Sequence, residues 1–102
     1  MDFLAAQQAA WSNKLAKGFN TTDVPLEFCY FQGEVAEAFH AWRYDSPELG
    51  EELADVAIYL LSLAEMTGVD LGAEVERKLA KNAERVYVRD ERSGVLRKAE
   101  PC

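Results

Sequence analysis

Two pairs of acidic residues are the features of this 102-residue sequence best suited to chemistry. Glu34 and Glu37 stand three residues apart, and so do Glu52 and Asp55. On a helix this spacing puts both side chains of a pair on one face, where like charges destabilise an isolated helix. Bringing the two pairs together is costly unless cations hold them. We therefore interpret the four carboxylates as a metal site.

The ligand type points to a hard cation. A site made only of carboxylate oxygens favours Mg²⁺, with Mn²⁺ as a substitute. Protein-bound Mg²⁺ keeps several waters and usually completes its shell with substrate phosphates. The sequence thus predicts a Mg²⁺ site that binds a polyphosphate. The competing interpretation is an ordinary solvated helix face that carries no ion.

Apolar periodicity and the positions of Gly and Pro predict four helices with short connections, which indicates an all-α bundle. Gly68 is expected to end the third helix, and Ser46 to cap its start with Pro47 as the first helical residue. The four expected helices cover residues 2–17, 25–43, 47–67 and 70–86. Residues 87–102 are expected to form a short hairpin or an arm that lies on another subunit.

The acidic pairs border the apolar faces of the two middle helices. At about 100° per residue, Glu34 lies at the edge of a broad apolar stripe. That stripe on the second helix consists of Phe28, Phe31, Val35, Ala38, Phe39 and Trp42. On the third helix, Glu52, Asp55 and Tyr59 form a line beside the core-facing leucines. The carboxylates are therefore expected at the seam between the two helices.

Assembly follows from size and from the third helix, which is apolar over more than half of its circumference. A chain this short is marginal as a monomer. We expect a single domain over residues 1–102, with a helical core at 2–87 and an arm at 88–102. We also expect this bundle to be completed by oligomerisation into a homodimer or homotetramer.

Composition excludes several classes of function. The formal charge of −7 argues against binding a nucleic-acid polymer or an anionic membrane. The first residues lack the basic start and apolar stretch of a signal peptide, and the sequence has only two cysteines. These features favour the cytoplasm. One histidine and no CxxC leave almost no ligands for structural zinc.

Taken together, the motifs resemble the MazG-like nucleoside triphosphate pyrophosphohydrolases. The resemblance rests on the two acidic pairs with their surroundings at residues 33–37 and 50–61, and on Lys78-x-x-x-Asn82-x-x-Arg85. It extends over about residues 3–87. The small single-domain members are the most similar, including the dCTP pyrophosphatase type.

This resemblance implies a reaction and a metal. Such enzymes cleave nucleoside triphosphates, here expected to be deoxynucleotides, between the α- and β-phosphates, and they release a nucleoside monophosphate and pyrophosphate. By this similarity, Glu34, Glu37, Glu52 and Asp55 bind Mg²⁺, and Glu37 is alternatively the general base. Nucleotide-pool cleansing is the expected role.

The resemblance also implies contacts to the nucleotide. Tyr59 and Asn82 are the expected nucleotide contacts, while Lys78, Lys81 and Arg85 would meet phosphate oxygens. Trp11 and Trp42 are candidates for stacking on the base. The alternative for the cations is a solvated helix surface, and for Trp42 a place in the core.

Two other functions stay open from the sequence. The first is a non-enzymatic helical module for dimerisation or partner binding, in which the acids are incidental. The second is a carboxylate-bridged di-iron bundle, because Glu37-x-x-His40 has the required spacing. His40, however, points about 120° away from Glu34 around the helix.

Overall fold

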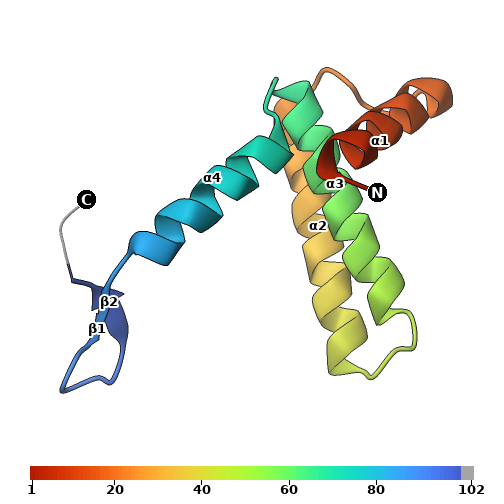
Figure 1. The fold of residues 1–102 in the computed structure, drawn as a ribbon. Helices are drawn as coiled ribbons and strands as arrows, with labels where there is room; N and C mark the ends of the chain where they lie inside the picture. Colours follow the sequence, from red (N-terminus) through yellow and green to blue (C-terminus); the bar gives the residue numbers. More distant parts are fainter. Residues whose placement is uncertain (100–102) are drawn as a thin grey trace. The chain divides into compact units, whose positions relative to one another are not determined.

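The structure is a computed structural model, and it describes residues 1–99. The expectation of an all-α fold with a short C-terminal hairpin is confirmed (Figure 1). The elements are α1 (Phe3–Lys17), α2 (Val24–Arg43), α3 (Leu49–Met66), α4 (Leu71–Glu84), β1 (Tyr87–Arg89) and β2 (Leu96–Lys98). The chain divides into two compact units, one at Met1–Gly72 and one from residue 73 onward.

The first two helices begin and end where their sequences supply caps. Asp2 accepts a hydrogen bond from the Ala5 backbone N–H at 2.7 Å and so caps α1. Gly18 follows the helix with φ 70°, a left-handed conformation that glycine adopts without steric cost. Asp23 caps α2 through the Leu26 N–H at 3.1 Å, with Pro25 in the first turn.

The third helix begins two residues later than the sequence predicts. Ser46 does not cap it, because the Ser46 N–H donates to the carbonyl of Ala41 and its hydroxyl accepts from the Glu48 N–H, at 2.8 and 3.1 Å. The first bond ties the connection back to the end of α2, and the second closes the turn before α3. Glu48 is the N-cap residue and makes no side-chain capping bond. At the other end of the chain, α4 stops before Val86, whose carbonyl pairs with the Ala99 N–H beside the hairpin.

Helix α2 packs along α3, and α1 crosses α3 (Figure 1). Small side chains, Ala38 and Ala41, are buried on α2, and Leu61, Leu63 and Ala64 are buried on α3. The predicted apolar stripe of α2 is only partly inward, since Phe28, Phe39 and Trp42 stay 47%, 57% and 62% exposed. One partner helix is too narrow to cover a stripe of that width.

Polar contacts attach α1 to the rest of the first unit. The buried Gln7 side chain donates to a carboxylate oxygen of Glu65 at 2.8 Å and to the Val69 carbonyl at 2.9 Å. It also accepts from the Leu71 N–H at 3.3 Å. A Cβ at Gly72 would lie 2.8 Å from the Cβ of Phe3, so the start of α1 fits closely against this turn.

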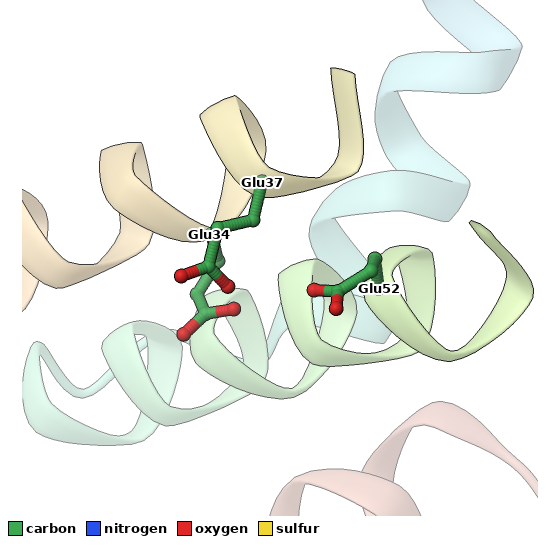
Figure 2. A group of neighbouring side chains, drawn as sticks. All are labelled: Glu34, Glu37 and Glu52. Atoms are coloured by element: carbon green, nitrogen blue, oxygen red, sulfur yellow. The ribbon is translucent and has the colours of Figure 1, made fainter. Parts of the chain in front are cut away.

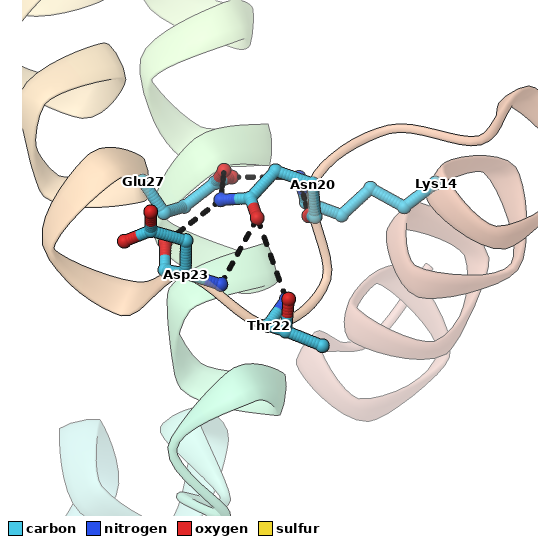
Figure 3. A network of polar contacts seen from close by, with 5 residues as sticks. All are labelled: Lys14, Asn20, Thr22, Asp23 and Glu27. Carbon is cyan, nitrogen blue, oxygen red and sulfur yellow. Dashed lines mark hydrogen bonds and ion pairs between the residues drawn. The ribbon is translucent and has the colours of Figure 1, made fainter.

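A buried ion pair joins α1 to α2 (Figure 3). The Lys14 Nζ lies 2.8 Å from a carboxylate oxygen of Glu27, and the two side chains are 8% and 0% exposed. Lys14 also donates to the Asn20 carbonyl at 2.7 Å, while the Asn20 amide donates to Glu27 at 3.2 Å. The Asn20 Oδ1 in turn accepts from the Asp23 N–H at 3.0 Å. This network fixes the loop between the helices.

The second unit consists of most of α4 and an antiparallel hairpin in which Tyr87 pairs with Lys98. The Asp90 carboxylate accepts from the backbone N–H groups of Ser93 and Arg92 in the turn, and these bonds lower the Asp90 pKa. Leu79 and Val86, which the periodicity predicts as inward, are each 62% exposed. No single helix within residues 1–99 has the length and hydropathy needed to span a bilayer.

The buried ion pair predicts a specific pattern of stability changes. Lys14→Met should reduce the free energy of unfolding by about 3–5 kcal/mol, because it leaves the Glu27 carboxylate buried without its cation. The double variant Lys14→Met/Glu27→Leu should lose less free energy of unfolding than Lys14→Met alone. Urea denaturation measures both. The exposed Lys17→Met is the matched control, expected within about 0.5 kcal/mol of wild type, and equal stabilities of Lys14→Met and Lys17→Met would contradict the buried pair.

Candidate metal centre

Three of the four predicted carboxylates converge between α2 and α3. Glu34, Glu37 and Glu52 each offer one oxygen, and these oxygens lie within 4.8 Å of one another. Figure 2 shows Glu34 and Glu37 extending from α2 toward α3, which carries Glu52. The close packing of two helices therefore brings together groups that are 15 or more residues apart in the sequence.

The donors of this cluster fit a hard divalent cation. One oxygen of Glu34 and one of Glu52 are buried and have no hydrogen-bond partner among residues 1–99. A buried carboxylate oxygen without a partner carries a desolvation cost that a protein does not usually accept. Each of the three ligands is an oxygen, as Mg²⁺ and Mn²⁺ prefer. The residues present are thus suited to holding such an ion.

Repulsion within the cluster shows in the proton affinities. The pKa of Glu34 is raised from 4.5, first by burial and then by the charge of Glu37 and a hydrogen bond with it. The pKa of Glu52 is also raised, first by burial and then by the charges of Glu37 and Asp55. Both shifts mean that the folded chain resists ionising these carboxyl groups. A bound cation would oppose both shifts.

Asp55 borders the converging oxygens without joining them. It lies three residues after Glu52 on α3 and is half-buried. Its charge raises the pKa values of both Glu34 and Glu52. Asp55 therefore belongs to the same electrostatic cluster, while its place among the ligands stays a prediction.

Tyr59 lies between the acidic cluster and a cavity of about 350 Å³. Burial raises its pKa first, followed by the charges of Glu34, Glu27 and Asp55. Its ring meets Tyr30 edge-on at 6.5 Å between centroids, and the Lys14 Nζ lies 5.9 Å from the ring centroid. Polar and aromatic residues from α1, α2, α3 and the α1–α2 loop line the cavity, including Asn13, Lys14, Asn20, Glu27, Tyr30 and Tyr59.

Sequence reasoning did not place Asn13, Asn20, Glu27 or Tyr30 at this cavity. Glu27 carried a usable signal, because it precedes Glu34 by seven residues and so shares its helix face.

The remaining candidates do not join the carboxylate cluster. Trp42 lines an apolar groove with Phe39, and Trp11 is half-buried on α1. The His40 ring lies 4.5 Å from the Tyr44 ring between centroids, tilted by 48°, and His40 is not among the converging ligands.

The predicted phosphate-binding residues lie in the second unit. Lys78 and Lys81 are exposed on α4. Asn82 is on the same helix and accepts a hydrogen bond from the Arg85 guanidinium at 3.1 Å. Their proposed contacts with a substrate stay predictions.

Comparison with known proteins gives one finding. A family model described as the MazG-like family matches residues 29–95, which is more than half of the chain. The match includes both acidic pairs and the Lys78–Arg85 segment. No curated protein and no solved structure matches the chain.

The raised pKa values predict how stability depends on pH without metal. A carboxyl group whose pKa is higher in the folded than in the unfolded chain stabilises the fold at low pH. This stabilisation is lost as the pH rises from the unfolded pKa of 4.5 through the raised pKa of the folded chain. Glu34→Gln/Glu52→Gln should therefore be more stable than wild type in EDTA at pH 7, and the difference should shrink toward pH 4.5. Urea denaturation across this range measures it. The exposed Glu76→Gln should show no such trend, and a double variant less stable than wild type at pH 7 would contradict the assignment.

Proposed function

This chain belongs to the MazG-like family, and on that premise we propose that it is a nucleoside triphosphate pyrophosphohydrolase that depends on a divalent metal. The proposed reaction breaks the bond between the α-phosphorus and the bridging oxygen to the β-phosphate. Water supplies the new oxygen, and the products are a nucleoside monophosphate and pyrophosphate. Deoxynucleoside triphosphates are the proposed substrates, and cytoplasmic nucleotide-pool cleansing is the proposed role.

One observation carries the proposal: three glutamate side chains converge at the seam of two helices, and two of them have a buried oxygen without a hydrogen-bond partner within residues 1–99. Glu34, Glu37 and Glu52 would hold Mg²⁺, or Mn²⁺ in its place, with Asp55 as the proposed fourth ligand. When bound, such an ion neutralises phosphate charge and lowers the pKa of a bound water. A helix pair without this purpose would not keep these carboxylates at a packed interface.

Exposure separates the roles of the three glutamates. Among residues 1–99, Glu34 and Glu52 are half-buried and each has a buried oxygen without a hydrogen-bond partner, which suits metal ligands. Glu37 is the exposed member of the cluster. Glu37 is therefore alternatively the general base instead of a full ligand, because an exposed carboxylate can accept a proton from an attacking water and pass it to bulk solvent.

The cavity beside Tyr59 is the proposed place for the nucleoside. It is next to the acidic cluster and combines aromatic rings with amide and charged side chains, as small-molecule sites do. The Tyr59 ring can stack on a base, and its hydroxyl can donate a hydrogen bond. Trp42 is turned about 140° from Glu37 around the axis of α2, at 100° per residue.

Charge supports the proposed role of the second unit. Residues 1–72 contain three basic residues, and Lys14 among them is buried against Glu27. Residues 73–99 contain eight. A triphosphate needs cations in addition to a metal, so Lys78, Lys81 and Arg85, with Asn82, are the proposed phosphate contacts.

Neutralising one ligand should abolish most of the activity. Glu52→Gln keeps the side-chain shape but removes a charge, and it should reduce Mg²⁺-dependent turnover by about 100-fold or more, because metal-assisted charge stabilisation is worth several kcal/mol. Chromatographic separation of monophosphate, diphosphate and pyrophosphate measures both rate and bond choice. The neighbouring exposed Glu51→Gln is the matched control with near-normal turnover expected. A folded Glu52→Gln protein with wild-type turnover, or a diphosphate product, would refute the proposal.

A second test separates the aromatic candidates. Tyr59→Ala should raise KM for the preferred triphosphate by about tenfold, since stacking on a base contributes about 1–3 kcal/mol. Trp42→Ala should leave KM within about twofold if the ring belongs to the apolar groove instead. Steady-state kinetics over a panel of nucleotides measures the KM values of both variants. A larger increase in KM for Trp42→Ala than for Tyr59→Ala would instead assign base stacking to Trp42.

A further inference from the structure

The buried ion pair of Lys14 and Glu27 lines the cavity at a level two helical turns from the acidic cluster. Glu27 precedes Glu34 by seven residues on α2, which places it on the same helix face and about 10 Å away along the axis. Because α2 and α3 run antiparallel (Figure 1), Tyr59 lies between these two levels, one turn beyond Asp55. A nucleotide with its phosphates at the cluster and its base on Tyr59 therefore extends toward the ion pair.

Of the two charged groups in this pair, the ammonium of Lys14 is the one that a ligand can meet. The Lys14 side chain is 8% exposed, whereas that of Glu27 is 0% exposed. An ammonium has three N–H donors. Within residues 1–99 the structure places two oxygens on it, from Glu27 at 2.8 Å and from the Asn20 carbonyl at 2.7 Å. One donor of Lys14 is therefore left for a group in the cavity.

The ammonium is held beside the ring on which the base is proposed to stack. The Lys14 Nζ lies 5.9 Å from the centroid of the Tyr59 ring, close enough to meet the edge of a base stacked there. Glu27 and the Asn20 carbonyl fix the ammonium, and a group that is already oriented loses little entropy when a ligand binds. Lysine offers donors and no acceptor. This part of the cavity thus presents a fixed, positively charged donor.

We propose that Lys14 donates a hydrogen bond to a carbonyl oxygen on the edge of the base opposite the glycosidic bond, and so selects the base. The inference rests on the proposed function and names its substrate class. Uracil, thymine and guanine carry a carbonyl group at that edge, whereas cytosine and adenine carry an amino group. An amino group would turn its N–H toward the ammonium and leave both donors unpaired. Glu27 is the positioning residue that holds Lys14.

Pairs of substrates that differ at this edge test the proposal on the wild-type protein. In dUTP and dITP a carbonyl replaces the amino group of dCTP and dATP, and the adjacent ring nitrogen gains a hydrogen. We expect kcat/KM to favour the carbonyl member of each pair by about 10- to 100-fold, as a hydrogen bond to a charged group would. Calorimetric titration with the α,β-imido analogues in Mg²⁺ should give the same order of Kd.

The outcomes of this comparison separate the base preference from the proposed function. Hydrolysis with equal kcat/KM for both members of a pair overturns the base preference alone. Preference for the amino members overturns it as well and assigns the edge of the base to an acceptor such as Glu27. Absence of both hydrolysis and binding for every triphosphate overturns the proposed function together with this inference.

A double variant tests whether Lys14 makes the difference. Lys14→Met/Glu27→Leu removes both charges together, and it should bring the dUTP to dCTP ratio of kcat/KM close to one. This ratio is independent of the folded fraction, so a merely structural role of Lys14 would leave it unchanged. Lys17→Met, exposed on the same helix and outside the cavity, is the matched control and should keep the wild-type ratio. A folded double variant with the wild-type ratio contradicts the role of Lys14, and the wild-type comparison decides the proposal if that variant does not fold.

Discussion

The close packing of α2 on α3 is the constraint on which the rest of the structure depends. Ala38 and Ala41 are buried on α2, and such small side chains let two helix backbones approach closely. That approach brings Glu34 and Glu52 within reach of each other despite their charge. The hydrophobic contacts between α2 and α3 thus offset the repulsion among the carboxylates. The raised pKa values of Glu34 and Glu52 reflect this repulsion. The arrangement of the carboxylates depends on the packing of α2 against α3, and it would be lost if the two helices moved apart.

Helix α1 adds the walls of the cavity and is held largely by polar contacts. Gln7 fixes one end through Glu65 and the turn before α4, and Lys14 fixes the other through Glu27. A shift of α1 would leave a buried amide or charge unpaired, which costs several kcal/mol. Apolar packing alone would permit more than one register. The polar anchors therefore fix the α1 wall of the cavity that Tyr59 also lines.

Local chemistry made much of the fold predictable. Apolar periodicity and the positions of Gly and Pro are local features, and the helix limits followed from them to within about two residues. The predicted start of α3 was wrong because the Ser46 N–H donates to the Ala41 carbonyl of α2, a contact that depends on how the chain turns. Periodicity correctly predicted how wide the apolar stripes of the helices are, but it does not show which neighbouring element covers each part of a stripe. Phe39 and Trp42 are apolar and exposed because one neighbouring helix covers only half of their stripe. The Lys14–Glu27 pair depends on a crossing of helices that no local pattern encodes.

The central claim is that the carboxylates between α2 and α3 exist to bind a divalent cation, and calorimetric titration of the metal-free protein with Mn²⁺ tests it most directly. Repeating the titration in two buffers of different ionisation enthalpy counts the protons released. Saturable binding with proton release that grows as pH is lowered toward the raised pKa values of Glu34 and Glu52 is the expected result, because the cation must displace those protons. The Glu34→Gln/Glu52→Gln protein should lose both the binding and the proton release. Absence of saturable binding in the folded wild type, or equal binding by the double variant, would contradict the account.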